Sequence, residues 1–122
     1  MITFGLVDED QVMKSICVKR GVAYDSDLSA YMAFEEASLL GVCIFSINGT
    51  NGKIVLCDTQ GQKLLHIEDG FVRAILSYMM KHKVHEVTCN AAIEKSILTN
   101  LGFTPLDESW KLSLDGYSFK KC

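Results

Sequence analysis

The first part of the chain has the apolar pattern of a strand followed by a helix. Residues 1–7 alternate between the two sides of a strand. Asp8, with Gln11 three residues later, is typical of a capping box at a helix start. Apolar residues then recur on one helical face: Val12, Met13, Ile16 and Cys17. Gly21 supplies the left-handed stop, so we expect a helix with a single apolar stripe.

Residues 30–58 predict three strands in succession. Residues 30–47 mix helix formers with β-branched and aromatic residues, which favour a hairpin with Glu35 and Glu36 at its tip. The turn-rich "NGTNG" separates this hairpin from the apolar run "KIVLCD". That run is typical of a strand buried on both faces. Three strands joined by short turns predict antiparallel pairing.

A core-facing helix is predicted after the polar loop "TQGQK", because apolar residues recur at helical spacing: Val72, Ile75, Leu76 and Met79. We expect the chain to enter this helix through an acidic residue and a glycine, Asp69 and Gly70. The segment "HEVTC" at residues 85–89 predicts the next strand.

The last part of the chain predicts a helix and a hairpin. Residues 91–100 carry inward apolar positions, and Gly102 ends the helix. The final hairpin is expected to turn at Asp115 and Gly116, between two alternating runs made of Trp110, Leu112, Leu114, Tyr117 and Phe119.

Composition and net charge limit the classes of protein to which the chain can belong. The 122 residues are 48% apolar, which fits a single domain over residues 1–122 with one core. The net charge is −3 and no Lys/Arg cluster occurs, so neither a nucleic-acid groove nor an anionic membrane surface is expected as a partner. No apolar run approaches the ~18 residues of a membrane span, and no leader pattern is present. We therefore expect a cytoplasmic protein.

The cysteines and histidines predict no metal site. The five cysteines are odd in number, widely spaced and never in Cys-x-x-Cys: Cys17, Cys43, Cys57, Cys89 and Cys122. His82 and His85 have too few further ligands nearby. No nucleophile-elbow or Walker pattern supports hydrolase or kinase chemistry.

The predicted order of elements resembles the GCN5-related N-acetyltransferase family, also called acyl-CoA N-acyltransferases. The most specific pieces are "SLLGVCIF", similar to the family's hairpin, and "AAIEKSILTNLGFTPL", similar to its last helix and the strand after it. The resemblance implies an α/β (α+β) fold with a mixed, mostly antiparallel central sheet flanked by helices. It also implies acetyl-CoA or coenzyme A as cofactor and a small-molecule or peptide amine as acceptor, and it is compatible with a homodimer.

The resemblance assigns a pyrophosphate site to the helix after the fourth strand. In the family this helix opens with Gln/Arg-x-x-Gly-x-Gly/Ala, whose backbone amides surround the pyrophosphate. The first glycine falls on Gly70, but Ile67 and Val72 occupy two other motif positions. The implied ligands are the amides of Gly70, Phe71, Val72 and Arg73. The alternative is that Asp69 caps the helix and Arg73 lies on its solvated face.

The family's fourth and fifth strands splay apart, and the pantetheine arm of the cofactor enters the gap. Those strands correspond to "KIVLCD" and "HEVTC". The resemblance therefore implies that Cys57, Cys89 and the adjacent Asn90 flank the acyl slot. The alternative is that both cysteines are ordinary core residues.

The catalytic groups are incomplete. The family's tyrosine, which protonates the departing thiolate, corresponds to Leu98, so water or another group would have to supply that proton. Asp58 is the candidate general base, and the alternative is a turn residue facing water. Two functions remain open: an N-acetyltransferase that uses acetyl-CoA, and a degenerate relative that acts as a binding or protein-interaction module.

Overall fold

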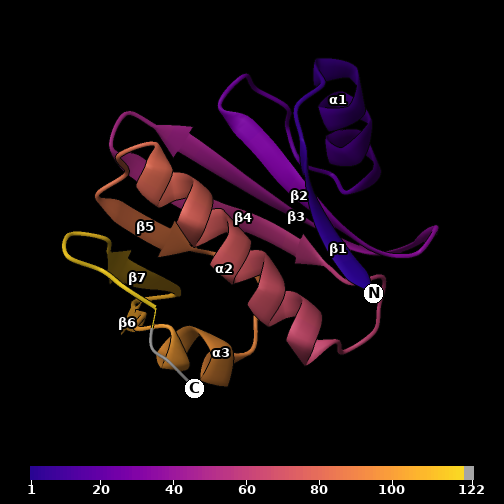
Figure 1. Ribbon diagram of the computed structural model, residues 1–122. Coiled ribbons are helices and arrows are strands. Elements are labelled where there is room, and N and C mark those ends of the chain that lie inside the picture. The colour runs from indigo at the N-terminus through magenta and orange to yellow at the C-terminus, as the bar shows by residue number, and fades with distance from the viewer. Residues whose placement is uncertain (120–122) are drawn as a thin grey trace.

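The computed structural model describes residues 1–119 and contains one seven-stranded sheet with three helices (Figure 1). Cys122 lies outside the described residues. None of the helices within residues 1–119 has the length and apolar character needed to cross a membrane. The elements are β1 (Ile2–Val7), α1 (Asp10–Lys19), β2 (Leu28–Glu35), β3 (Ser38–Asn48), β4 (Asn51–Asp58), α2 (Leu65–Lys81), β5 (Glu86–Cys89), α3 (Lys95–Asn100), β6 (Thr104–Leu106) and β7 (Ser109–Ser113).

The sheet has the strand order β1-β2-β3-β4-β5-β7-β6. Only β4 and β5 run parallel, because the chain crosses over through α2 between them. All other neighbours are antiparallel. The predicted fold class, a mixed and mostly antiparallel sheet flanked by helices, is confirmed.

The helices cover the sheet unequally. The long helix α2 crosses one face, and α3 packs on the same side (Figure 1). The short helix α1 packs on the opposite face, where it shares a separate cluster with β2 and β3. The predicted stripe of α2 is fully buried and forms the centre of the larger core: Val72, Ile75, Leu76 and Met79.

The predicted N-terminal half is confirmed in its elements but not in every detail. Glu36, at the tip of the β2–β3 hairpin, has φ 56°, which the turn requires. The N-cap of α1 is Glu9 rather than Asp8, and it makes no side-chain cap bond. β4 is not buried on both faces, because Lys53 points to solvent on the side that α2 does not cover.

The predicted C-terminal hairpin is wrong by one strand. β7 pairs with β6 across a turn at Asp107, whose φ is 53°. The Asp115-Gly116 turn exists, but no strand follows it within the described residues. The physical reason is that the Tyr117 hydroxyl donates to the carbonyl of Leu101, which draws the chain back onto the end of α3. The helix α3 is also shorter than predicted and begins only at Lys95.

Candidate functional site

β4 and β5 separate partway along their length. They pair from Asn51–Glu86 to Ile54–Cys89, and the Asn90 amide donates a last bond of 3.0 Å to the Ile54 carbonyl. β4 then continues to Asp58, whereas the chain after Asn90 turns toward α3. Within residues 1–119, the side of β4 that faces away from β3 therefore has no strand beside it from residue 55 to 58, which leaves backbone groups free to bind an extended ligand. We call this edge and the gap beside it the slot.

A bulge lies where the slot begins. Ile44 pairs with Leu56 and Phe45 pairs with Ile54, so Val55 is an extra residue in β4. A bulge of this kind bends its strand and increases the local twist. It therefore accounts for the departure of β4 from β5 at this point.

The start of α2 lies beside the end of β4. Backbone bonds to the helix begin with Ile67 and Glu68, which both donate to the Leu64 carbonyl. Within residues 1–119, the preceding amides of Lys63, Leu64, Leu65 and His66 have no acceptor. Free amides at a helix start carry partial positive charge and favour an anion.

A network of charges spans the mouth of the slot. Lys63 Nζ lies 2.6 Å from Glu94 Oε2, and this contact raises the pKa of Lys63. The Glu94 amide in turn donates to Glu68 Oε1 at 2.9 Å. These bonds join the loop before α2 to the segment before α3, across the gap between β4 and β5.

Sequence reasoning missed Glu68. Its exposed fraction is only 4%, which makes it the one buried charged residue among those described. The sequence did contain an indication of its burial, because Glu68 lies one helical turn before Val72, on the apolar stripe of α2. A carboxylate on such a stripe needs a buried partner. The Glu94 amide provides it.

The prediction for Gly70 to Arg73 is wrong in its premise. α2 begins at Leu65, so these four residues lie in its second and third turns and their amides are not at the helix start. Phe71 and Val72 also have no exposed surface. The error came from reading Asp69 as the N-cap, when its carboxylate instead binds Arg73 one turn later at 2.8 Å.

Gly70 and Arg73 make packing contacts in the structure. A Cβ at Gly70 would lie 2.2 Å from Cζ of Phe4, so the glycine lets β1 approach α2 closely. Phe4 also meets Phe71 edge to face, with ring centroids 5.3 Å apart. Arg73 lies over the ring of Phe119 at 5.6 Å. The interpretation of Arg73 as a residue of the outer helix face agrees with these contacts.

Three cysteines gather on the α2 side of the slot. Cys43 and Cys57 are partners across β3 and β4, and the neighbouring Cys57 thiol, together with burial, raises the pKa of Cys43. Burial raises the pKa of Cys89 to about 11. Cys57 is half-buried, whereas Cys89 is 1% exposed. Only Cys57 therefore presents a thiol surface near the slot.

Asp58 anchors the end of β4. Its Oδ2 accepts from Arg20 Nε at 2.9 Å, and its Oδ1 accepts from the Gln60 amide at 2.8 Å. Arg20 also donates to the Ile16 carbonyl, so the pair ties the end of α1 to β4. Asp58 is thus more than a turn residue facing water. Its role as a general base stays a prediction.

Leu98 is fully buried in the larger core, so its side chain contributes packing alone at the position of the family's tyrosine.

The face of the sheet that carries α1 has two open pockets of about 370 Å³ each. One lies between α1 and the strands β2 and β3. The other is polar, lies over β3, β4, β5 and β7, and includes Asn90 in its lining. Asn90 therefore has its amide in the sheet and its side chain beside this polar pocket.

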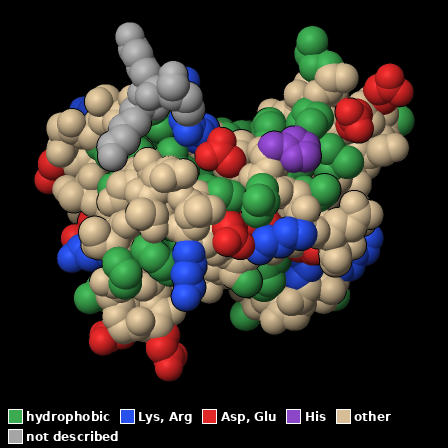
Figure 2. All heavy atoms as spheres, turned by 90° about the horizontal axis from the view of Figure 1, so that it is seen from below, with side chains coloured by type: hydrophobic (Ala, Val, Ile, Leu, Met, Phe, Trp, Pro, Cys, Tyr) green, Lys and Arg blue, Asp and Glu red, His purple; other side chains and the backbone are tan. Residues whose placement is uncertain are grey.

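Figure 2 views the molecule from below Figure 1, at the end where α2 begins. Apolar, acidic and basic side chains alternate over this face, and neither charge sign forms a large patch on it. An anion here would be held by local amides and single cations rather than by a broad positive field.

Comparison with known proteins identifies solved structures that have a similar fold. No protein-family model matches the chain, and no curated protein matches it in sequence. Among solved structures, the ribosomal-protein-S18-alanine N-acetyltransferase of Escherichia coli is similar with a TM-score of 0.69, at 7% identity over 93% of this chain and 94% of that one. The acetyltransferase of Bacillus subtilis in complex with CoA gives 0.64, at 16% identity over 93% and 99%.

The N-acetyltransferase PseH of Campylobacter jejuni, in complex with acetyl coenzyme A, has a TM-score of 0.60. Its identity is 18%, over 93% of this chain and 99% of that one. At identities this low, structural similarity establishes the fold but not the activity. The chain has the fold of the GCN5-related N-acetyltransferases.

Proposed function

We propose that this protein is an N-acetyltransferase that binds acetyl-CoA and transfers its acetyl group to an amine. The observation that carries the proposal is the slot, where the edge of β4 lacks a neighbour directly beside the free amides that start α2. A strand edge suits the amide-containing arm of the cofactor, and a helix start suits its pyrophosphate. Structures of the same fold in complex with CoA or acetyl coenzyme A support this interpretation.

In this proposal the pyrophosphate lies about seven residues earlier in the chain than the sequence motif implied. Its ligands would be the amides of residues 63–66, and the pantetheine arm would lie along residues 55–58. Lys63 would add positive charge after exchanging its bond to Glu94 for one to phosphate. The residues present therefore fit the cofactor, although Lys63 already has a carboxylate partner.

Acetyl-CoA supplies a thioester: its carbonyl carbon gains a bond to the amine nitrogen and loses its bond to sulfur, while the amine gives up a proton and the thiolate takes one. Asp58 is the candidate for the first proton, because it lies at the end of β4 and each oxygen accepts only one bond from the protein. Leu98 cannot supply the second proton, so we assign it to water.

A degenerate relative that binds without turnover is the second candidate. Two observations favour it: the position of the family's acid is a buried leucine, and the cation beside the helix start is held by Glu94 at 2.6 Å. Such a protein would bind the cofactor or a partner through the same slot.

Calorimetric titration with acetyl-CoA tests the proposal, followed by mass spectrometry of a mixture of amines for acetylated products. We expect binding with a rise in melting temperature, because a ligand of the native state stabilises it by mass action. Lys63→Gln should weaken binding by roughly three- to tenfold. Arg73→Gln, the matched removal of a cation paired on α2, should leave the affinity unchanged.

The outcomes separate the candidates. Binding together with product supports the enzyme. Binding without product for any amine supports the degenerate relative. No heat and no thermal shift at millimolar acetyl-CoA would reject the cofactor site altogether.

A further inference from the structure

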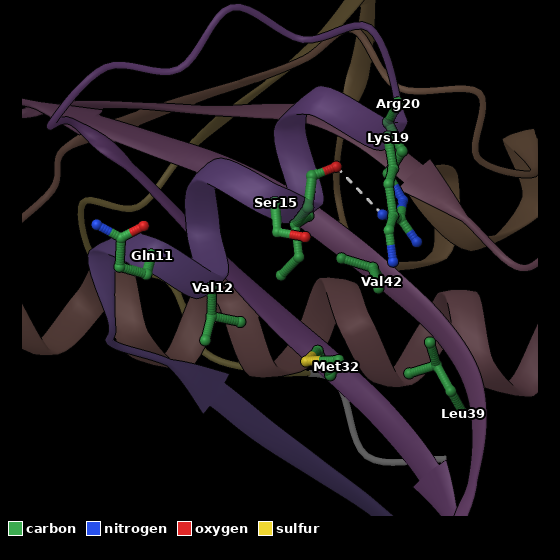
Figure 3. Close-up of a pocket in the computed structure, with 9 residues that line it drawn as sticks. Gln11, Val12, Ser15, Lys19, Arg20, Met32, Leu39 and Val42 are labelled. Atoms are coloured by element: carbon green, nitrogen blue, oxygen red, sulfur yellow. Dashed lines mark hydrogen bonds between the residues drawn. The ribbon is translucent and has the colours of Figure 1, made fainter.

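The groove between α1 and β2–β3 is a surface feature that the cofactor slot does not explain. The 10 residues of α1 span only about 15 Å, whereas the 8 residues of β2 and the 11 residues of β3 span about 26 and 36 Å, so the helix leaves part of this face open. The groove measures about 370 Å³, within the range of small-molecule sites. Figure 3 shows α1 above the strands with side chains of both lining it.

The groove has an apolar wall and a cationic end. Apolar side chains come from both sides: Val12 and Ile16 of α1, with Met32, Leu39 and Val42 of the strands. Lys19 and Arg20 lie at one end, and Figure 3 shows them side by side. No Asp or Glu lines the groove.

The two cations differ in how far they are already neutralised. Arg20 uses Nε for Asp58 and one Nη1 hydrogen for the Ile16 carbonyl, which leaves three of its five N–H donors. Lys19 makes no ion pair with any residue among 1–119. Arg20, Lys19 and Asp58 together therefore carry one net positive charge at this end. An anionic group on a ligand would complement it.

The cationic end adjoins the end of the slot strand. Arg20 binds Asp58, the last residue of β4, and Val42 in the groove is the register partner of Asp58. The side chain of Gln60 also donates to the carbonyl of Leu39, a groove residue, so the loop after β4 is bound to β3. A carboxylate held here would place an amine on the adjacent carbon next to the end of β4.

We propose that this groove binds an α-amino acid with an apolar side chain, its carboxylate at Lys19 and Arg20 and its side chain along the apolar wall, as the acceptor amine. The role of the amino acid as acceptor rests on the proposed function. Its binding in the groove does not depend on that function. The α-amino acid fits because its carboxylate and amine are separated by one carbon, whereas a plain alkylamine would leave the cations without a partner.

The test is protein-detected NMR titration of the full chain, with and without coenzyme A, using phenylalanine, leucine, phenylalaninamide and phenethylamine. We expect phenylalanine or leucine to shift the signals of Val12, Ser15 and Met32. Phenylalanine should bind about tenfold more tightly than phenylalaninamide, which has the same side chain and amine but no carboxylate. Phenethylamine should bind as weakly as the amide.

Lys19→Gln should remove that tenfold preference. The matched control is Lys14→Gln on the same helix, because Lys14 lies over the ring of Tyr24 at 5.6 Å and does not line the groove. Ser15→Trp should fill the groove and abolish binding without lowering the melting temperature. Equal affinity for acid and amide, persistence of the preference in Lys19→Gln, or no binding of either amino acid would overturn the proposal.

The acetyl-CoA titration is an independent readout. Amino-acid binding in the groove without acetyl-CoA binding would keep this inference and reject the enzyme. Binding of acetyl-CoA without binding of amino acids in the groove would reject this inference and leave the proposed enzyme standing.

Discussion

The two faces of the sheet differ in how completely a helix covers them. On the α2 side, a 17-residue helix crosses the sheet and closes a core of 20 buried residues. On the α1 side, a 10-residue helix closes a cluster of only eight and leaves two open pockets. Burial is the main source of stability, so most of the stability belongs to the α2 face. The α1 face contributes less to stability and has open surface for a ligand.

The largest expected effect is a difference in the free energy of unfolding when the same substitution, Ile to Ala, is made on each face of the sheet. Ile75→Ala removes a side chain with no exposed surface from the α2 core, and should lower the free energy of unfolding by about 4 kcal/mol. Ile16→Ala, beside the α1 groove, should cost about 2 kcal/mol because the site is already open on one side. Urea denaturation measures both. An equal or larger loss for Ile16→Ala would contradict the division.

Alkaline pH should weaken the α2 face in particular. Burial raises the pKa of Cys89 from 9.0 to about 11, so the folded protein holds this proton more tightly than the unfolded chain does. Its stabilising contribution is complete below pH 9 and is lost as the pH rises through about 11. The loss amounts to about 2–3 kcal/mol.

The Cys89→Ala variant provides the control for this pH effect. Other groups that titrate in the same range remain in both proteins, so the parent should lose more unfolding free energy between pH 8 and pH 11 than the variant. Parallel pH profiles would show that Cys89 does not titrate as its burial requires.

Gly70→Ala tests whether this glycine serves packing or the cofactor. A Cβ would overlap the Phe4 ring, so we expect a loss of about 1–3 kcal/mol with unchanged affinity for acetyl-CoA. Gly5→Ala is the matched control, because no atom lies within 4 Å of its added Cβ. In a Phe4→Leu background the Gly70→Ala cost should largely disappear. Lost cofactor affinity in a stable Gly70→Ala protein would restore the motif-based site.

Of the two ion pairs, the less exposed one should contribute more to the free energy of unfolding. Arg20–Asp58 joins two elements and Arg20 is only 14% exposed, so Arg20→Met should cost about 1–2 kcal/mol. Arg73–Asp69 lies within one helix, with both side chains about one-third exposed, so Arg73→Met should cost less than about 0.5 kcal/mol. Thermal or urea unfolding of the two variants decides whether the link between α1 and β4 is the stronger one.

The sequence predicted the fold well because periodicity and glycine stops report directly on buried faces. The stripe of α2 and the end of α3 at Gly102, with its φ of 101°, both follow from such local rules. The β6–β7 hairpin was misplaced because the Asp115-Gly116 turn signal is real, whereas the contact of Tyr117 with Leu101 that prevents a return strand is not local.

The site was harder to predict because its position depends on where one helix begins. Asp69 and Gly70 look like a helix start, yet α2 begins one turn earlier with Leu64 as an uncapped N-cap. Tertiary packing decides this start: Ile67 is fully buried, and Glu68 reaches the Glu94 amide. No local capping rule contains that information. The groove under α1 is equally invisible to the sequence, because it results from the length of α1 relative to its strands.

The position of the cofactor is central to the proposed function, and amide-resolved NMR titration with coenzyme A tests that position most directly. We predict that the signals of residues 55–58 and 63–66 shift together and saturate, since within residues 1–119 the side of β4 that faces away from β3 has no strand partner over residues 55–58 and the amides of residues 63–66 have no acceptor. The amides of Phe71, Val72 and Arg73 should stay in place, because they lie inside α2. Saturation with shifts centred on Gly70 to Arg73, or shifts that avoid the edge of β4, would contradict the slot.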